Sequence, residues 1–316
     1  MFMEKKELVS IIIPTCNRDD LIEETIISVL SQTYNNIEVI IVDDHSSETT
    51  ITNVKSILNK YLSQATIRFI ENEGKGACAA RNTGFRHSNG QYIQFFDDDD
   101  LMLPSHIEEK VKAFKEGVDY VACNYTFFNS EDPSVIIDRK DISSIKHTAA
   151  AHILLKSLPT PCFMCTRDTI NKIGLWNENI KKLQDFSYFH RLFLNDCRGK
   201  FLDEYLFTVR IHPKSMTRSN INAVEGQIYS LQSMQSVKSE WKEVGGAKWK
   251  SIKLPIIFME FTTGRNLYLK GFKRKGIMLL VKLAINNPYE ILQLVLKSIK
   301  YKTSHLTEVL VKESTL

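Results

Sequence analysis

Short runs of apolar, mostly β-branched residues alternate along the first 96 residues with stretches whose apolar positions recur at helical spacing. The runs predict a buried strand over residues 8–13, ended by Pro14, and further strands over residues 37–42, 67–70 and 92–96. Asn17 is placed to cap the helix that follows. The three predicted helical faces comprise Leu21, Ile22, Ile26, Val29 and Leu30, then Ile51, Val54, Ile57, Leu58 and Leu62, then residues 77–85.

This alternation of strands and helices predicts right-handed crossovers and a mostly parallel, doubly wound α/β sheet. In such sheets ligands bind outside the carboxyl ends of the strands. Polar clusters stand at three of the predicted strand ends, at residues 15–18, 43–47 and 97–100. We therefore expect one ligand site at this edge of the sheet.

Beyond residue 105 the pattern loosens into short mixed elements, and beyond residue 220 it becomes helical. The stretch 270–302 mixes lysines and arginines with aliphatic residues. Two interpretations stay open: amphipathic helices that pack on the catalytic domain or in a homodimer, and peripheral docking on an anionic inner membrane surface. No apolar run approaches the ~18 residues of a membrane span.

Composition narrows the function classes only slightly. Lys and Arg exceed Asp and Glu by 41 to 37, an excess too small to indicate a nucleic-acid partner. The six cysteines are scattered and the first residues carry no apolar signal-peptide core, which indicates a reducing, cytoplasmic protein. Cys162 and Cys165 form a lone C-x-x-C inside an apolar stretch and are expected to be buried thiols.

Four consecutive aspartates, Asp97 to Asp100, stand directly after the fourth predicted strand. Like charges ~4 Å apart cost about 4 kcal/mol per pair at an effective dielectric of ~20. A divalent cation would remove that cost, and hard oxygen ligands suit Mg²⁺ or Mn²⁺ held together with substrate phosphates. No P-loop is present. A near match to a dinucleotide fingerprint at Gly74–Ala79 leaves an NAD-dependent oxidoreductase as an alternative.

Five ordered motifs, at residues 9–18, 28–34, 41–46, 80–84 and 97–104, resemble those of family 2 glycosyltransferases. The resemblance implies a GT-A nucleotide-sugar-binding fold with a C-terminal helical extension. It also implies a nucleotide-sugar donor, usually UDP-linked, and a reaction that inverts the anomeric centre. On this basis residues 1–105 form the nucleotide-sugar-binding half of the domain, residues 106–220 the acceptor-binding half, and residues 221–316 a helical region that could associate with a membrane.

The same resemblance assigns roles at the nucleotide end of the site. Asp44 would accept a hydrogen bond from uracil N3–H, as a carboxylate can. Arg81 would face the nucleotide or diphosphate, or be an ordinary helix salt-bridge partner. The other positions implied are Pro14, Thr15 and Asn17 lining the nucleotide pocket, Asp97 or Asp98 near the ribose or a metal-bound water, and Asp99 as the direct metal ligand.

At the acceptor end, residues 174–177 and 184–189 resemble the segment that holds the family's general base, with Asp185 in that role. Gln184 stands where the family often has an acidic residue, and a helix-capping or ion-pair role for Asp185 stays open. In residues 209–217, which resemble a later segment, His212 would approach the metal or diphosphate, or be structural. Trp176 would stack on an acceptor sugar or belong to the core.

Together these features predict a metal-dependent hexosyltransferase. The expected donor is a UDP-sugar, with glucose or galactose favoured. The expected acceptor is a lipid-linked saccharide of the undecaprenyl-pyrophosphate type, in bacterial O-antigen or capsule synthesis. The enzyme would be cytoplasmic or peripheral on the inner membrane. A non-catalytic nucleotide-sugar-binding protein is the competing class.

Overall fold

The computed structural model describes residues 6–61, 66–130, 132–143, 148–155, 158–212, 224–300 and Leu310. The chain divides into two compact units, which we describe separately. The sheet unit comprises 1–145, 159–179 and 195–212, and the helical unit comprises 146–158, 180–194 and 213–316. The division into halves at residues 105 and 220 stays a prediction.

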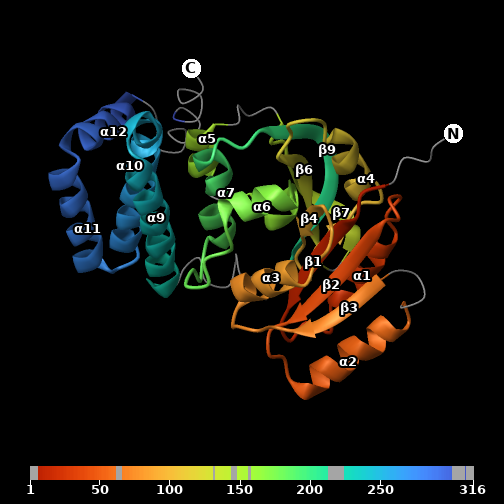
Figure 1. Cartoon of the computed structure of the whole chain (residues 1–316). Coiled ribbons are helices and arrows are strands. Elements are labelled where there is room, and N and C mark those ends of the chain that lie inside the picture. The colour runs from red at the N-terminus through yellow and green to blue at the C-terminus, as the bar shows by residue number, and fades with distance from the viewer. Residues whose placement is uncertain are drawn as a thin grey trace. The chain divides into compact units, whose positions relative to one another are not determined.

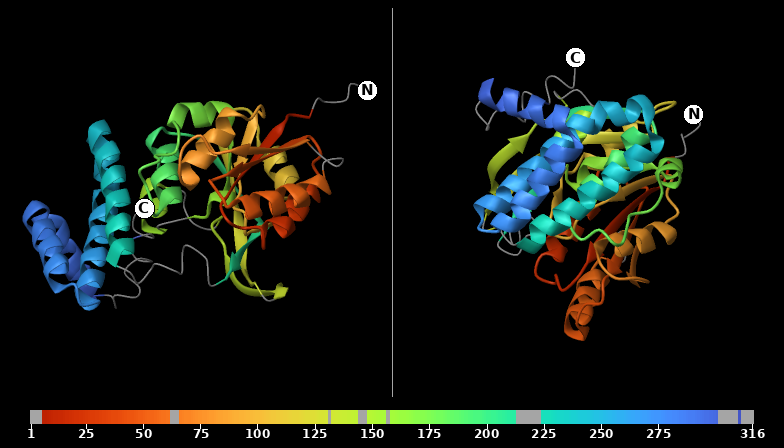
Figure 2. Two further views of the ribbon diagram at one scale, coloured as in Figure 1. Left: turned by 90° about the horizontal axis from the view of Figure 1, so that it is seen from below. Right: turned by 90° about the vertical axis from the view of Figure 1, so that its left-hand side faces the viewer.

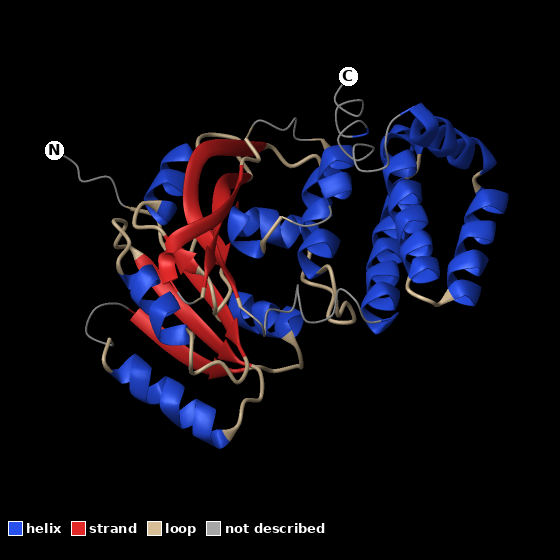
Figure 3. Cartoon of the chain, turned by 180° about the vertical axis from the view of Figure 1, so that it is seen from behind, coloured by secondary structure: helices blue, strands red, loops and turns tan. Residues whose placement is uncertain are grey.

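The sheet unit is built on nine strands in one sheet, with the order β3-β2-β1-β4-β8-β6-β9-β5 and β7 paired to β6 (Figure 3). Its elements are β1 (Val9–Thr15), α1 (Ile22–Leu30), β2 (Ile37–Asp43), α2 (Glu48–Asn59), β3 (Thr66–Glu71), α3 (Ala77–Arg86), β4 (Tyr92–Phe95), β5 (Leu101–Met102), α4 (His106–Ala113), β6 (Tyr120–Asn129), β7 (Asp132–Lys140), η1 (Thr160–Cys162), β8 (Phe163–Thr166), α6 (Arg167–Ile173) and β9 (Gly199–Ile211).

Strands β3, β2, β1 and β4 run parallel, as the sequence pattern predicts (Figure 1). The chain steps from β1 to β2 to β3 on one side of β1, and then crosses back to place β4 on the other side. With right-handed crossovers, this reversal puts α1 and α2 on one face of the sheet and α3 on the other. The strand order therefore reverses between β1 and β4, where a doubly wound sheet opens a crevice for ligands.

Two local predictions in this region are wrong. Pro14 does not end β1, which continues through Thr15. Ile12 accepts a hydrogen bond on the β4 side from Phe96. Pro14 lies two residues further along the strand, so its backbone nitrogen points to the same side as Ile12. At that level β4 has already ended, and no strand there needs the N–H that proline lacks. Asn17 does not cap α1, whose N-cap is Leu21, without a side-chain hydrogen bond. The second and third helices form where predicted, although Leu62 lies outside the described residues.

Beyond β4 the sheet turns antiparallel. Strand β8 pairs with β4 and β6, whereas β9 runs parallel to β6 and brings residues near 210 back beside the aspartate run. Cys162 and Cys165 lie buried in this half as thiols, which confirms that prediction. Burial raises the pKa of the Cys165 thiol.

The helical unit confirms the predicted C-terminal helices (Figure 2). A core of buried side chains from α5, α7, α9 and α10 holds it together: Ile153, Phe186, Met234, Val237, Trp241, Ile252, Ile256 and Met259. Among the described residues, no helix has the length and apolar character needed to cross a bilayer. The helices are α5 (Ala149–Leu155), α7 (Gln184–Leu194), α9 (Val224–Val244), α10 (Gly246–Leu269), α11 (Lys273–Asn286) and α12 (Pro288–Lys300).

A buried imidazole makes this unit sensitive to acid. His152 packs on the rings of Phe186 and Phe193, and burial lowers its pKa to about 4. Between pH 6.5, the ordinary pKa of a histidine in the unfolded chain, and pH 4, the unfolded chain binds a proton at His152 that the folded chain does not bind. The free energy of unfolding therefore decreases as the pH falls through this range. We expect the free energy of unfolding to drop by about 2 kcal/mol from pH 7 to pH 5 through this group.

Denaturant titration at both pH values tests this. His152→Phe keeps a ring between the two phenylalanines and should make the drop about 2 kcal/mol smaller than in the wild type. The buried His106 and His190, whose pKa values burial also lowers, continue to contribute to the remaining drop. His87→Phe, at an exposed histidine, is the matched control and should leave it unchanged. Equal acid sensitivity of the wild type and the His152 variant would contradict the assignment.

Candidate active site

The predicted edge of the sheet does gather the polar clusters. At the carboxyl end of β1, Thr15 is buried and its hydroxyl donates to Asp98 Oδ2 at 2.7 Å. Its carbonyl accepts from the backbone N–H of Asp44 at 2.8 Å, which ties the end of β1 to that of β2. Pro14 lies beside them, buried in β1. The ends of β1, β2 and β4 thus form one continuous surface at the switch point.

Asn17 connects two loops of this surface. It adopts a left-handed backbone conformation, with φ of 51°. Its backbone N–H donates to Ser46 Oγ at 2.8 Å, and its side-chain oxygen accepts from Ser47 N–H at 3.0 Å. Asn tolerates this conformation better than most residues. Asn17 therefore fixes the rim of the proposed nucleotide pocket.

The Asp44 carboxylate forms hydrogen bonds with the loop that follows β3. Both of its oxygens accept the backbone N–H of Gly76 at 2.9 Å, and Oδ1 also accepts from Asn72 Nδ2 at 2.7 Å. Gly76 needs its φ of 89° to make this turn. The N–H group that a dinucleotide phosphate would use at this glycine is bound internally, which disfavours the NAD alternative. Hydrogen bonding of Asp44 to uracil stays a prediction.

The first two aspartates of the run have different partners. Asp97 forms an ion pair with Arg81, with 2.8 Å between Oδ1 and the guanidinium nitrogen. Asp98 accepts from the Thr15 hydroxyl, but desolvation, and next the charge of Asp99, raise its pKa to about 7. Part of the repulsion within the run is therefore relieved by an arginine and by proton uptake.

The Asp99 carboxylate contacts the side chains of Arg18 and His212. Its Oδ2 lies 2.9 Å from an Arg18 guanidinium nitrogen and 3.0 Å from His212 Nε2. The Arg18 and His212 nitrogens are themselves 3.3 Å apart. Asp99 and Arg18 side chains are one-fifth exposed or less, and His212 is buried. The structure thus brings Asp99 and His212 together, as a shared metal site requires.

The fourth aspartate is structural. Asp100 is buried and accepts the backbone N–H of Arg210 at 3.0 Å, and burial raises its pKa. Arg210 also donates from Nε to the Asp99 carbonyl at 2.8 Å and pairs with Glu24 at 2.7 Å. It stacks on Phe128. Strand β9 therefore holds the aspartate loop against α1 through Arg210, a residue that the sequence motifs did not indicate.

The side chains of Asp99 and His212 fit a divalent metal that has few protein ligands. One carboxylate oxygen and one imidazole nitrogen converge at Asp99 and His212, and both are donors that Mn²⁺ accepts. No group of three or more His, Cys, Asp or Glu side chains is arranged for a metal within the described part of the chain. Mg²⁺ and Mn²⁺ commonly need only one or two protein ligands plus substrate phosphates. The residues suit a metal that a donor diphosphate completes.

Arg81 and Trp176 are both buried. Arg81 forms a salt bridge, and its role toward the nucleotide or diphosphate stays a prediction. The guanidinium lies 4.7 Å from the centre of the Trp176 ring while it pairs with Asp97. The Trp176 ring packs edge-on against Phe95. The neighbouring Asn82 bonds both the backbone N–H and the carbonyl of Trp176. Helix α3 thus joins the aspartate run to the loop after α6, and Trp176 belongs to the core.

We expect Arg81→Ala to lower the free energy of unfolding by about 3 kcal/mol, because it removes a largely buried ion pair with Asp97 and the contact of the guanidinium with the Trp176 ring. Urea denaturation measures the effect. Arg86→Ala on the same helix breaks an exposed ion pair with Glu73 and should cost less than about 1 kcal/mol. Equal losses from the two variants would contradict the structural role of Arg81.

Asp185 lies in the first turn of α7, in the helical unit, and is partly exposed. Leu183, two residues earlier, adopts a positive φ of 53° that turns the chain into the helix. A position in the first turn of a helix is compatible with the helix-capping alternative for Asp185. The catalytic role of Asp185 stays a prediction.

The sheet unit combines a parallel, doubly wound half, a carboxylate run at its switch point and an antiparallel second half. The mannosyltransferase PcManGT from Pyrobaculum calidifontis, solved in complex with GDP-Man and Mn²⁺, has the same fold, with a TM-score of 0.61 at 17% identity over 98% of this chain and 86% of that one. The chain therefore has the fold of the GT-A glycosyltransferase structures.

Sequence comparisons make the assignment more specific. The model described as Glycosyl transferase family 2 matches residues 10–172. An uncharacterized glycosyltransferase of Rickettsia typhi is 31% identical over 274 residues, which cover 84% of this chain and 83% of that protein. The chain belongs to glycosyl transferase family 2. The Escherichia coli protein WfgD, a UDP-Glc:alpha-D-GlcNAc-diphosphoundecaprenol beta-1,3-glucosyltransferase, is 36% identical over 125 residues, which cover 39% of this chain and 47% of that protein.

Proposed function

We propose that the enzyme transfers a hexosyl group, glucose or galactose, from a UDP-sugar to a lipid-linked saccharide with inversion at the anomeric carbon. The observation that carries the proposal is the convergence of Asp99, His212 and Arg18 at the switch point of a family 2 glycosyltransferase. The name of WfgD, with its UDP-glucose donor and diphosphoundecaprenol acceptor, supports the choice of substrates.

The UDP-sugar donor would bind at the edge of the sheet formed by the carboxyl ends of β1, β2 and β4. In this proposal Pro14, Thr15 and Asn17 line the nucleotide pocket, and Asp44 is directed at the base. Asp97 or Asp98 lies near the ribose or a metal-bound water, and Arg81 lies toward the nucleotide or diphosphate. Asp99 and His212 would hold a divalent Mn²⁺ or Mg²⁺, which when bound neutralises charge on the diphosphate leaving group. Arg18 adds a positive charge at the same place, since its guanidinium contacts Asp99.

Transfer is a single displacement. The acceptor hydroxyl oxygen forms a bond to C1 of the sugar as the bond from C1 to the β-phosphate oxygen breaks, and its electron pair stays on UDP. The hydroxyl proton passes to the Asp185 carboxylate, which acts as general base. The accumulated negative charge on UDP is the charge that cationic groups in the site must stabilise.

An acceptor on undecaprenyl pyrophosphate would place the reaction at the cytoplasmic face of the inner membrane, in the assembly of a bacterial surface polysaccharide such as O-antigen or capsule. This role rests on similarity to relatives rather than on the site itself.

A screen of UDP-sugars with lipid-pyrophosphate acceptors, with Mn²⁺ or Mg²⁺, tests the function. We expect one UDP-hexose to give a β-linked product identified by NMR. UDP binding without transfer to any acceptor in the screen would instead support a non-catalytic nucleotide-sugar-binding protein.

A further inference from the structure

Helix α11 uses one face to pack against α10. A Cβ atom at Gly276 would come within 2.7 Å of the Gly264 carbonyl oxygen and of the Tyr268 backbone nitrogen, so only glycine allows the two helices to approach this closely. Leu283, two turns further along, is buried on the same face. The orientation of α11 is therefore fixed, and so is the face that it turns outward.

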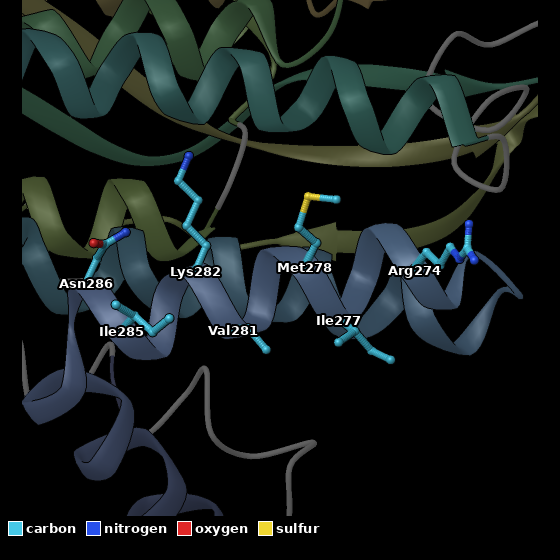
Figure 4. A pocket seen from close by; sticks show the side chains of 7 residues that line it. All are labelled: Arg274, Ile277, Met278, Val281, Lys282, Ile285 and Asn286. Carbon is cyan, nitrogen blue, oxygen red and sulfur yellow. The ribbon is translucent and has the colours of Figure 1, made fainter.

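The outward face of α11 is apolar. Met278 and Ile285 are 68% and 72% exposed, and Ile277 and Val281 are about half exposed. Together with Arg274, Lys282 and Asn286 they line an open hollow along the helix (Figure 4). The described part of α12 continues this character with four exposed residues: Tyr289, Leu292, Val295 and Leu296. Exposed apolar side chains gathered in this number on neighbouring helices indicate an interaction site.

The charge around this face has one sign. The exposed cations are Lys270, Lys273, Arg274, Lys275 and Lys282. Glu290 is the one acidic residue between positions 270 and 296, and its carboxylate pairs with Lys253. Three of the cations stand in the first turn of α11, which holds no acidic residue. Cations at a helix N-terminus oppose the helix macrodipole and reduce its stability, so their placement points to an anionic partner.

We propose that the exposed face of α11 and α12 docks on the anionic surface of a phospholipid bilayer. The apolar side chains would enter the boundary between headgroups and acyl chains, and the lysines and Arg274 would contact the acidic headgroups. A second copy of the chain fits less well, because a symmetric contact would bring two basic faces together. The choice of a bilayer over an acidic protein rests on the proposed function, whose acceptor is lipid-linked.

Vesicle flotation of the full-length protein tests the docking. The vesicles contain phosphatidylcholine alone, or equal parts of phosphatidylcholine and phosphatidylglycerol. One variant carries Lys273→Glu, Arg274→Glu and Lys275→Glu. A second carries Ile277→Ser, Val281→Ser and Ile285→Ser. The matched control carries three serines at exposed apolar positions of β7 in the sheet unit, namely Val135→Ser, Ile136→Ser and Ile137→Ser.

We expect binding to the anionic vesicles that weakens as salt is added. Reversal of the three charges should weaken it at least about 100-fold, since each basic residue near the surface contributes about fivefold. The same variant should keep or raise the melting temperature, because acids favour the helix N-terminus. The apolar variant should also lose binding, whereas the β7 control should keep it.

Equal binding to both kinds of vesicle, or unchanged binding by either α11 variant, would overturn the proposal. A second result would also overturn it: the wild type does not bind vesicles but self-associates in sedimentation, and the apolar variant does not self-associate. The partner of this face would then be a second copy of the chain. Transfer to a water-soluble, short-chain acceptor reports the proposed function separately. The α11 variants should retain that activity, and its absence in wild type would count against the function without affecting the docking.

Discussion

Replacing Asp185 with Asn is expected to lower kcat for sugar transfer about 1000-fold, because an amide cannot accept the acceptor hydroxyl proton and general-base catalysis typically contributes 10²–10⁴-fold. UDP binding should stay unchanged, since the assigned donor-binding residues belong to the sheet unit. Calorimetry with UDP and Mn²⁺ measures binding, and product formation under saturating donor measures transfer. A large fall in kcat with intact binding is the expected signature of the base.

The competing role for Asp185 is stabilisation of the α7 N-terminus. Asp168→Asn is the matched control, because Asp168 also lies in the first turn of a helix, α6, and is exposed. Each substitution should cost less than about 1 kcal/mol of stability through the helix dipole. If the Asp185 variant keeps normal turnover, or if both variants lose activity in proportion to their melting temperatures, Asp185 is not the base.

The parallel half of the sheet could be predicted because its information is local. Four strands and three helices follow from apolar periodicity, and residues 37–43 and 92–95 form strands within one residue of the prediction. Pro14 shows the limit of this approach. Proline prevents a strand from continuing only where its missing N–H would face a neighbouring strand, and the sequence does not reveal that β4 ends at Phe95.

The partners of the aspartate run could not be predicted, because they come from distant parts of the chain. Repulsion among four carboxylates suggested that a divalent cation is required. In the structure Arg81 pairs with Asp97 and Arg18 with Asp99, while the raised pKa values of Asp98 and Asp100 reduce their charge. Protein groups therefore relieve part of the repulsion, and the case for a metal rests on the geometry of Asp99 and His212 and on the family.

Arg18 carried a usable signal in the sequence, since it closes the polar cluster after the first strand. Arg210 carried a weaker one: it lies two residues before His212, so a strand pairing that brings His212 to the site also brings Arg210 close. The ion pair of Arg210 with Glu24 could not be assigned before the pairing of β9 with β5 and β6 was known.

We expect Asp99→Ala to remove the dependence of UDP binding on Mn²⁺ and to lower transfer by about 1000-fold, because loss of the metal removes several kcal/mol of charge stabilisation at the leaving group. The measurement is the ratio of UDP dissociation constants with and without Mn²⁺. Asp138→Ala, at an exposed ion pair with Lys140, is the control and should leave this ratio unchanged.

Asp99 also pairs with Arg18, so the loss of that ion pair needs a test of its own. Arg18→Gln breaks the pair but leaves the Asp99 carboxylate beside His212. If Asp99 holds the metal, the Arg18 variant binds UDP more weakly in both conditions yet keeps the Mn²⁺ dependence, because only the guanidinium charge is lost. If Asp99 serves only to position Arg18, both variants lose the same activity and neither changes the ratio. If Asp99 holds the metal, His212→Ala should also remove the Mn²⁺ dependence of UDP binding, since the imidazole is the second protein ligand of the proposed metal. If Asp99 only positions Arg18, His212→Ala should leave that dependence unchanged.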